Sequence, residues 1–370
     1  NLVMERQAAG KPNHSRKGQN TQVFRQTRTF QRCFTRISAA MRDLLKFGVT
    51  QPAENRLKTV LVINYSQTGQ LAEITAQLIT PLRAAGHRVH LETLVPEKPF
   101  PWPWPVVDFI DAFPECVQLD PPPLKPLSIA ADRQFDLIIL TYQVWYLAPA
   151  LPMTAFLQSP AGQQLIKGKP VITLVACRNM WLSAQATMRR LIAETGGQLR
   201  DHLAFTDQGH ALATFITTPR WVLTGRRDRF LGLPPAGVAP EEIRQASRFG
   251  RALADALDHD SEKSGTPMLT GLRAATVNPR LALSERAGHR AFRVWSKLIR
   301  AFGKRGQWRR RPILLVFVLY LITLIVTVVP LSLLVQWLFA PLLKPRLDRL
   351  RTELELPSGS QEFNLQKYDQ

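Results

Sequence analysis

The stretch "TVLVINYSQTGQLAEIT", residues 59–75, decides the fold class because it changes from a strand pattern to a helix pattern across a polar loop. Residues 59–65 are mostly apolar and β-branched, as in a buried strand, and residues 70–86 have the apolar spacing of a helix that ends at a glycine. Small hydroxylated residues lie between the two, at 66–69. A strand that ends in such residues at a helix start favours a phosphate-binding loop.

The residues of this loop narrow the kind of phosphate. No lysine follows Gly69, which excludes a Walker A loop for a triphosphate, and the lack of two further glycines excludes a dinucleotide fingerprint. The hydroxyls of Ser66 and Thr68, with the backbone N–H groups of residues 67–71, suit a monophosphate dianion. An ordinary helix cap uses the same residue types, so the loop alone leaves both interpretations open.

Four further strand patterns follow along the chain, separated by helical patterns. They are "HRVHLETL" (87–94), "FDLIILTY" (135–142), "KPVITLVAC" (169–177) and "LRDHLAFTD" (199–207). Strands that alternate with helices predict a doubly wound α/β domain with a parallel sheet, here over residues 58–258. The proline-rich insertion over residues 96–134 is predicted to be a rigid surface loop, in which Trp102 and Trp104 cover a ligand, touch a membrane or simply pack.

Three of the loops reach the same edge of the predicted sheet, because the carboxyl ends of parallel strands lie together. The second loop, after residue 142, carries Trp145 and Tyr146, which would be exposed unless a flat ligand or the helical segment 149–157 covers them. The third, after residue 177, adds Arg178. A phosphate loop beside aromatic side chains suits flavin mononucleotide (FMN), which has a phosphate at one end and a flat redox ring at the other.

The segments "VLVINYSQTGQLAEIT" (60–75), "DLIILTYQVWYLAPALPMTAFL" (136–157) and "GKPVITLVACRNMW" (168–181) together resemble the flavodoxin-like FMN proteins, which include flavodoxins and NAD(P)H:quinone reductases. The resemblance implies a five-stranded sheet of order 2-1-3-4-5, FMN as cofactor and, in the reductases, NAD(P)H as electron donor and dimers as the common state. It implies that the phosphate lies against Ser66, Gln67, Thr68, Gly69 and Gln70, and the ring against Gln143, Val144, Trp145, Tyr146, Arg178, Asn179 and Met180.

One departure from this family leaves the ring contacts open. Many members have Thr-Pro before the aromatic pair and Gly after it. This chain has Tyr142 and Gln143 before the pair, and Leu147 and Ala148 after it.

A second resemblance covers more of the chain. "NYSQTGQL" (64–71), "FPWPW" (100–104), "PECV" (114–117) and "SRFG" (247–250) are similar to proteins called dialkylresorcinol condensing enzymes. Condensation needs a cysteine activated by a histidine, and here only Cys177 lies at the predicted sheet edge, with His202 or His210 as candidate partners. Flavin chemistry in the same pathway, the aromatisation of a cyclohexanedione, is the interpretation we favour.

The charge and hydropathy patterns of the C-terminal third of the chain predict a membrane anchor. A polar linker (259–278) precedes a basic amphipathic helix (279–311), which we expect to rest on anionic lipid. Residues 312–343 carry no charge and predict one transmembrane helix, followed by a tail, 344–370. The greater number of cations before the span places the N-terminal bulk in the cytoplasm, at the inner membrane in a bacterium. A re-entrant hairpin around Pro330 is the alternative.

The charge distribution argues against nucleic-acid binding. Residues 1–58 carry 12 Lys and Arg against three acidic residues, and residues 292–311 carry eight and no acid, so most of the net charge of +20 lies outside the predicted α/β domain. Residues 1–57 are predicted to be a basic, disordered extension. The three cysteines are far apart, which predicts neither a disulfide framework nor a metal site.

These patterns lead to one function hypothesis and three alternatives. The first is a membrane-anchored, FMN-dependent oxidoreductase that acts on a lipophilic small molecule such as an alkylated cyclohexanedione. The alternatives are an NAD(P)H:quinone reductase, a flavodoxin-type electron carrier and a non-catalytic scaffold. The near-neutral α/β domain disfavours the carrier, which usually has an acidic docking face.

Overall fold

The computed structural model describes residues 57–369 except 211, 329 and 332–337. The extension predicted over residues 1–57 therefore lies outside the described residues, apart from Leu57. The described chain contains a parallel sheet in the order β2-β1-β3-β5-β6. Its strands are β1 (Thr59–Asn64), β2 (Arg88–Thr93), β3 (Leu137–Trp145), β5 (Pro170–Cys177) and β6 (Gln198–Thr206), and the two-residue β4 (Ala148–Pro149) pairs antiparallel with β3.

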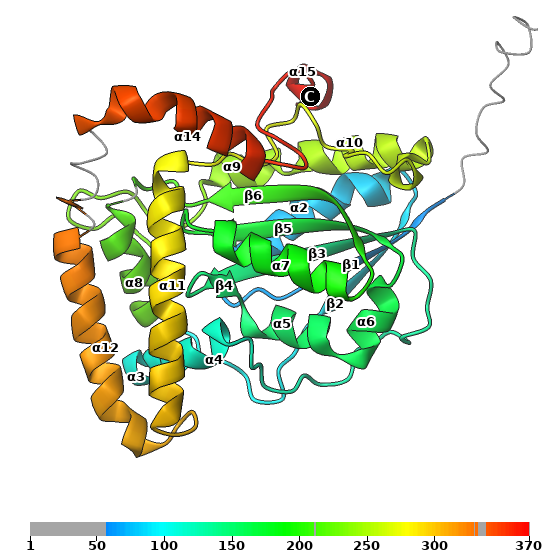
Figure 1. The fold of residues 1–370 in the computed structure, drawn as a ribbon. Helices are drawn as coiled ribbons and strands as arrows, with labels where there is room; N and C mark the ends of the chain where they lie inside the picture. The colour runs from blue at the N-terminus through cyan, green and yellow to red at the C-terminus, as the bar shows by residue number, and fades with distance from the viewer. Residues whose placement is uncertain (1–56, 211, 329, 332–337, 370) are drawn as a thin grey trace, which may run out of the picture. The chain divides into compact units, whose positions relative to one another are not determined.

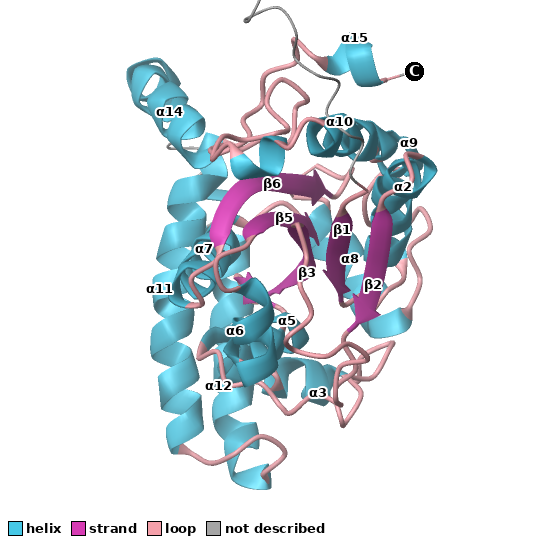
Figure 2. Cartoon of the chain, turned by 90° about the vertical axis from the view of Figure 1, so that its right-hand side faces the viewer, coloured by secondary structure: helices cyan, strands magenta, loops and turns pink. Residues whose placement is uncertain are grey.

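Helices cover both faces of the sheet (Figure 1, Figure 2). One face carries α2 (Gln70–Ala84), α9 (Pro240–Gln245) and α10 (Ser247–Asp258), and the other carries α5 (Leu151–Gln158), α6 (Pro160–Ile166) and α7 (Leu182–Glu194). Val60 and Val62 of β1 are buried with α2 and α10, whereas Leu61 and Ile63 are buried on the α5 and α7 side. This burial on both faces explains the continuous apolar runs of the sequence and confirms the predicted doubly wound α/β class.

Two segments, one predicted to be a rigid surface loop and the other a polar linker, contribute residues to the core. The insertion 96–134 forms α3 (Val106–Asp111) and α4 (Phe113–Val117), and Phe113 and Cys116 are fully buried. The linker 259–278 buries Leu269 completely, and it includes the short η1 (Ser261–Lys263). Proline and polar residues dominate the composition of these segments, while a few apolar residues decide where they pack.

The C-terminal part is helical. It comprises α8 (Thr214–Thr224), α11 (Pro279–Ala301), η2 (Trp308–Arg310), α12 (Arg311–Thr323), the π-helical η3 (Leu324–Val328), α14 (Ala340–Leu354) and α15 (Leu365–Tyr368). Figure 1 shows α11 and α12 side by side and antiparallel, joined by a short turn. Among the described residues, Trp308–Val328 is the one helix long and apolar enough to cross a membrane, with a mean hydropathy of 2.4.

The single helix predicted over residues 312–343 is corrected by this structure. The apolar helix ends its regular part at Thr323, and α14 is a separate helix with Pro341 in its first turn. The absence of charge over residues 312–343 indicates an apolar environment but does not say where a helix ends. The apolar helix is also followed by a further helical segment and a tail, so it is not the last element of the chain.

Candidate functional site

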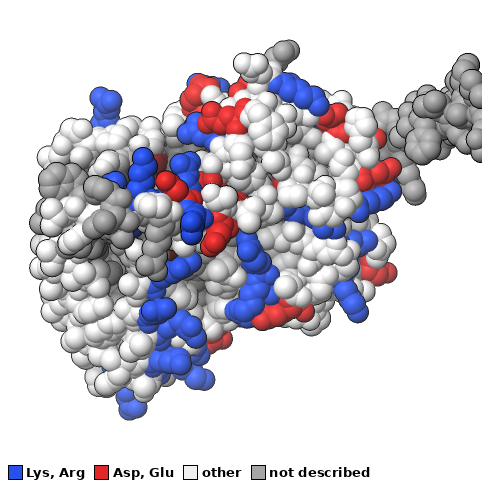
Figure 3. All heavy atoms as spheres, turned by 45° about the horizontal axis from the view of Figure 1, so that its top comes forward, with Lys and Arg blue, Asp and Glu red and all other residues white. Residues whose placement is uncertain are grey.

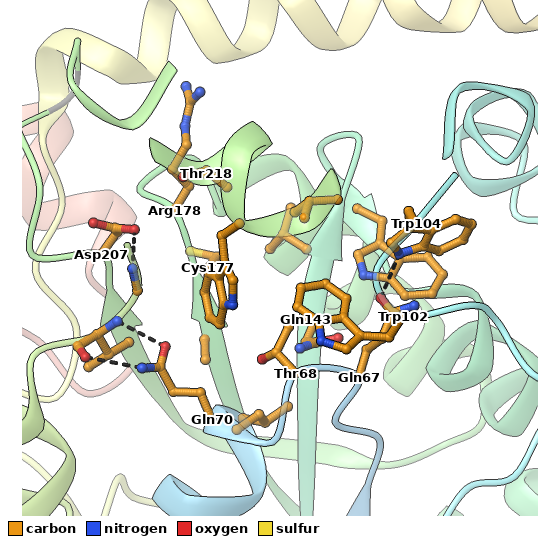
Figure 4. A pocket seen from close by; sticks show the side chains of 18 of the residues that line it. Gln67, Thr68, Gln70, Trp102, Trp104, Gln143, Cys177, Arg178, Asp207 and Thr218 are labelled. Carbon is orange, nitrogen blue, oxygen red and sulfur yellow. Dashed lines mark hydrogen bonds between the residues drawn. The ribbon is translucent and has the colours of Figure 1, made fainter. Parts of the chain in front are cut away.

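The carboxyl ends of β1, β3 and β5 border a cavity of about 200 Å³ (Figure 4). It lies where the strand order reverses between β1 and β3, which is the usual ligand site of an open α/β sheet. The predicted site residues that line it are Gln67, Thr68, Gln70, Gln143, Val144, Trp145, Tyr146 and Arg178. The three predicted loops therefore meet at one cavity. Ser66, Gly69, Asn179 and Met180 do not line it.

The first loop combines a helix cap with an open approach to the helix start. The N-cap of α2 is Gly69, and the Ser66 hydroxyl, three residues earlier, accepts a hydrogen bond from the backbone N–H of Ala72 in the first turn at 3.2 Å. Gly69 has a φ of +84°, and a Cβ built on it would meet no atom within 4 Å. The N-terminus of α2 is therefore open beside Thr68, and its N–H groups and dipole favour an anion there.

The two glutamines of this loop connect it to distant segments. The Gln67 side chain accepts a hydrogen bond from the Trp104 indole at 2.9 Å and donates one to the Pro101 carbonyl at 2.9 Å. The Gln70 side chain accepts from the backbone N–H of Val238 at 2.9 Å and donates to its carbonyl at 3.1 Å. The side-chain amides of Gln67 and Gln70 thus bond within the protein. The groups of these two residues that could bind a ligand are their backbone N–H groups.

The second loop contains a buried amide and a strained backbone. The Gln143 Oε1 atom is buried with no hydrogen-bond partner in the described part of the chain, and the same is true of the Thr218 hydroxyl on α8, which also lines the cavity. Tyr146 and Leu147 have positive φ values of 52° and 62°, a region that disfavours residues with a side chain. Leu147 occupies the position at which many flavodoxin-like FMN proteins have glycine.

Both aromatic side chains of this loop line the cavity and also pack within the protein. The Trp145 ring meets the rings of Phe100 and Trp104 edge-on, with centroids 5.0 and 5.6 Å apart. The Tyr146 hydroxyl donates to the carbonyl of Phe109, and its ring lies 5.3 Å from that of Phe113. Trp145 and Tyr146 are both half-buried, so packing within the protein covers only part of each ring.

The third loop brings one cation to the cavity. Arg178 places its guanidinium 4.0 Å from the centroid of the Phe215 ring, on the side of α8, and Figure 4 shows it pointing away from Thr68 and Gln143. Burial lowers the pKa of Arg178 to about 10. Asp207, which also lines the cavity, acts on the charge of Arg178, but the described residues form no ion pair with this arginine within bonding distance.

One wall of the cavity joins the proline-rich segment to α8. Trp102 meets Trp221 of α8 edge-on at 5.9 Å, and the backbone N–H of Trp104 donates to the Val222 carbonyl at 2.9 Å. The proline-rich segment and α8 thus form one wall of the cavity, which favours the ligand-covering interpretation of Trp102 and Trp104 over the membrane one.

Asp207, at the end of the fifth parallel strand, was not predicted from the sequence. Its carboxylate accepts hydrogen bonds from the N–H groups of Gly209 at 2.7 Å and Gly237 at 2.6 Å. Gly237 has a φ of +97°, and a Cβ there would lie 2.6 Å from the Gln70 Oε1 atom, so this position requires glycine. An aspartate two residues before a glycine, as in "TDQG", is the signal that could have indicated this turn.

Cys177 lines the cavity but lacks the partner that condensation needs. Burial raises the pKa of its thiol well above the usual range. Burial also lowers the pKa of His202 to about 3, and the His202 ring bonds to the Thr173 hydroxyl at 2.9 Å. His210 is exposed and contacts its own loop. A neutral thiol with no adjacent base is a poor nucleophile, so the structure does not support the condensing alternative.

The order and parallel register of the five main strands settle the fold class. This is the flavodoxin-like fold. No protein-family model matches the chain, and no curated protein sequence matches it. The flavodoxin-like assignment therefore rests on the sheet itself.

Solved structures similar to the chain are distant. A flavoprotein from Lactobacillus acidophilus in complex with FMN is 16% identical, covers 40% of this chain and 93% of its own, and has a TM-score of 0.34. A flavodoxin from the domain Archaea is 11% identical over 54% of this chain and 99% of its own, with a TM-score of 0.31. A flavone reductase is 13% identical over 55% of this chain and 64% of its own, with a TM-score of 0.30.

Proposed function

We propose that this protein is an FMN-dependent oxidoreductase that acts at a membrane on a lipophilic small molecule. The observation that carries the proposal is the composition of the cavity at the sheet edge. An open helix N-terminus, aromatic walls and two buried polar atoms without partners, Gln143 Oε1 and Thr218 Oγ1, meet in one place. A ligand with an anionic end, a flat ring and polar ring atoms satisfies all three features.

The residues present fit FMN in two parts. The backbone N–H groups of residues 67–71 and the Thr68 hydroxyl would hold the phosphate, with the dipole of α2 favouring its charge. Gln143 and Thr218 would bond to polar atoms of the ring, and Trp145 would contact its apolar surface. Bound FMN would supply hydride or single-electron transfer at its ring. The aromatic wall around Trp102 and Trp221 would exclude water from that ring.

The cavity walls also support a lipophilic substrate. Phe109, Val144 and Val222 line the cavity and carry no charge. Two reactions are consistent with such a site. One is the oxidation of an alkylated cyclohexanedione to an aromatic resorcinol, in which the substrate gives up a hydride and a proton. The other is the reduction of a quinone with electrons from NAD(P)H.

The first experiment identifies the cofactor. The detergent-solubilised full chain is titrated with FMN, and we expect saturable quenching of flavin fluorescence together with the visible flavin absorption bands in the purified complex. Trp145→Ala should weaken FMN binding about tenfold or more, since aromatic contacts to flat rings contribute about 1–3 kcal/mol each. Trp295→Ala, which removes a tryptophan outside the cavity, is the control. Absence of FMN binding by the folded wild-type chain would reject the proposal.

The second experiment separates the two reactions. Anaerobic addition of NADPH or NADH to the flavin complex bleaches the flavin if the protein is a quinone reductase. Bleaching by an alkylated cyclohexanedione, with no response to NAD(P)H, indicates the aromatising oxidase. If neither compound class reduces the flavin while dithionite does, the oxidoreductase assignment is wrong and an electron carrier is the better interpretation.

A further inference from the structure

The apolar helix α12 starts at an anchor on the α/β domain. Arg310, directly before α12, is fully buried. Its guanidinium donates to both carboxylate oxygens of Glu115 at 2.9 and 3.2 Å, and its Nε atom lies 3.1 Å from Asp111. Asp111 and Glu115 belong to α3 and α4, so the N-terminal end of the apolar segment is fixed to the same domain that holds the cavity.

The chain beyond α14 is anchored to that domain as well. The Ser358 hydroxyl donates to Asp201 of β6 at 2.8 Å and accepts from the backbone N–H of His202 at 2.8 Å. The Lys367 ammonium donates to Asp255 of α10 at 2.7 Å. Ser358 is buried, so this contact is part of the core. The tail after residue 355 therefore returns to the sheet and to α10.

These two anchors are incompatible with one crossing of a bilayer. A single span between Arg310 and Ser358 would place the tail on the side of the membrane opposite to β6. Two crossings would need roughly 40 apolar residues, and the uncharged segment 312–343 is shorter than that. If the apolar segment binds a bilayer, it must therefore do so from one side of the membrane, without crossing it.

The inward face of α12 is already packed. Leu314 and Phe317 are buried. The Phe317 ring stacks on that of Phe113 with centroids 4.2 Å apart and an angle of 13° between the planes, and Trp295 of α11 lies 5.6 Å from Phe317. This packing also accounts for the apolar face of α11 that the sequence predicted to rest on lipid, because part of it contacts α12 instead.

The outward face of α12 is apolar and uncovered. Only 11% of the most apolar 18-residue stretch within Trp308–Val328 is buried. Its outward stripe follows the helical repeat and consists of Leu315 (61% exposed), Leu319 (57%), Ile322 (53%) and Val326 (66%). The two threonines beside this stripe bond within the helix, Thr323 to the Leu319 carbonyl at 2.9 Å and Thr327 to the Thr323 carbonyl at 2.6 Å. Polar groups satisfied within the helix suit a lipid environment.

Basic residues border this stripe at the end where α12 begins. Lys304, Arg309 and Arg311 are exposed, and Trp308 beside them is 71% exposed. Figure 3 shows Lys and Arg side chains gathered beside the mostly uncharged side of the molecule that carries α12 in Figure 1. Cations and an exposed tryptophan next to an apolar stripe match the headgroup layer of an anionic membrane.

We propose that α12 lies in the plane of the membrane and inserts its outward stripe into one leaflet of an anionic bilayer, without crossing it. Lipid is the occupant that the basic border and the internally bonded threonines favour over a second copy of the chain. Phe113 contacts both Phe317 of α12 and Tyr146, which lines the cavity, so two aromatic contacts separate the inserted helix from the site. This mode of binding does not depend on FMN.

Labelling tests the topology. Single cysteines are introduced by Asp132→Cys, in an exposed loop of the domain, and by Gln366→Cys, in the exposed tail, and the full chain in bacterial inner-membrane vesicles of defined orientation is treated with a membrane-impermeant maleimide. The chain without an added cysteine is the control. We expect both sites to react from the same side. If the two cysteines react from opposite sides, the segment crosses the bilayer and the proposal is wrong.

Vesicle binding tests the stripe. Purified protein is mixed with vesicles of phosphatidylcholine alone or with phosphatidylglycerol, and bound protein is separated by flotation. We expect strong binding only to the anionic vesicles, reduced about tenfold by Leu319→Glu, since binding scales with inserted apolar area. Leu91→Glu, at a 40% exposed apolar residue of β2, should bind like the wild type.

Two outcomes of this measurement would overturn the proposal. The first is equal vesicle binding by the two glutamate variants, with circular dichroism confirming that both are folded. The second is that the wild type forms a dimer that does not bind vesicles, while Leu319→Glu is a monomer. This result would mean that the stripe contacts a second copy of the chain. FMN affinity is measured separately, so a failure of membrane binding is distinct from a failure of the proposed function.

Discussion

The cavity and the anchors of the α12 segment differ in how their buried polar side chains are paired. In the cavity, Gln143 Oε1 and Thr218 Oγ1 have no partner among the described residues, and Leu147 holds a φ of 62°. At the anchors, Arg310 bonds to Glu115, and Ser358 bonds to Asp201. The Arg310 Nε and Asp111 Oδ1 atoms make no hydrogen bond with the described residues, but they lie 3.1 Å apart as an ion pair. Unpaired buried groups and left-handed backbone reduce stability, whereas paired groups fix the chain. The difference indicates that the cavity binds a ligand and that the anchors attach the α12 segment to the α/β domain.

Removing Arg310 should produce the largest effect. Arg310→Met leaves Asp111 and Glu115 buried without their cation, which costs about 3–5 kcal/mol in the free energy of unfolding. Urea unfolding of the full chain in detergent, followed by circular dichroism, measures this loss. The neighbouring Arg309 is exposed, so Arg309→Met should change the stability by less than about 0.5 kcal/mol. Similar stabilities for both variants would mean that this anchor does not hold α12.

The tail anchor predicts a pH effect through His202. Burial, with a smaller contribution from the charge of Arg189, lowers the pKa of His202 from 6.5 to about 3. Below pH 6.5 the unfolded chain binds a proton that the folded chain does not, so stability falls as the pH decreases toward 3. Between pH 7 and pH 5 this loss amounts to about 1–2 kcal/mol.

The wild type is compared with His202→Gln to isolate this contribution from other titrating groups. Unfolding free energies of both proteins are measured at pH 7 and pH 5. The wild type should lose more stability than the variant over this interval. Equal losses would show that His202 is as easily protonated in the folded protein as in the unfolded one.

In the cavity, Gln143→Leu should have effects of opposite sign on stability and binding. The substitution removes a buried atom that has no partner, which should raise the unfolding free energy of the FMN-free protein by about 1 kcal/mol. The same change removes a bond to the ring and should weaken FMN binding about 3- to 10-fold. Thermal unfolding without FMN and fluorescence titration with FMN measure the two effects.

Gln70→Leu is the matched control, because its amide bonds to both backbone groups of Val238. This variant should lose stability, since two buried backbone groups become unpaired. If both substitutions destabilise the FMN-free protein, the Gln143 amide has a structural role like that of Gln70, and the proposed difference between the two amides is wrong.

The sequence predicted the sheet edge well because periodicity and strand order determine it. Parallel strands bring their carboxyl ends together, so loops that follow 64, 142 and 177 had to meet. Trp145 followed from this geometry, and Gln143 followed from the resemblance to the flavodoxin-like FMN proteins. Asn179 and Met180 did not reach the cavity, because the third loop turns after Arg178 toward α7, where Trp181 packs on His202.

The sequence could not predict contacts between distant segments. The wall formed by Trp102 and Trp221 joins a proline-rich insertion to a helix more than a hundred residues later, and no local pattern records that pairing. The return of the tail to Asp201 is of the same kind. Hydropathy indicated an apolar environment for residues 312–343, but it carries no information on where the following residues pack.

The smallest predicted effect concerns the strain at Leu147. A left-handed conformation costs a residue with a Cβ about 1 kcal/mol, and glycine avoids this cost but loses more entropy on folding. Leu147→Gly alone mixes strain relief with the loss of the leucine side chain, so the useful comparison is with Leu147→Ala, which loses the side chain but keeps the strain. We expect Leu147→Gly to unfold with a free energy a few tenths to about 1 kcal/mol higher than Leu147→Ala. If the alanine variant is the more stable of the two, the backbone at this position stores no strain, and the contrast between the cavity and the anchors then rests on the unpaired atoms of Gln143 and Thr218 alone.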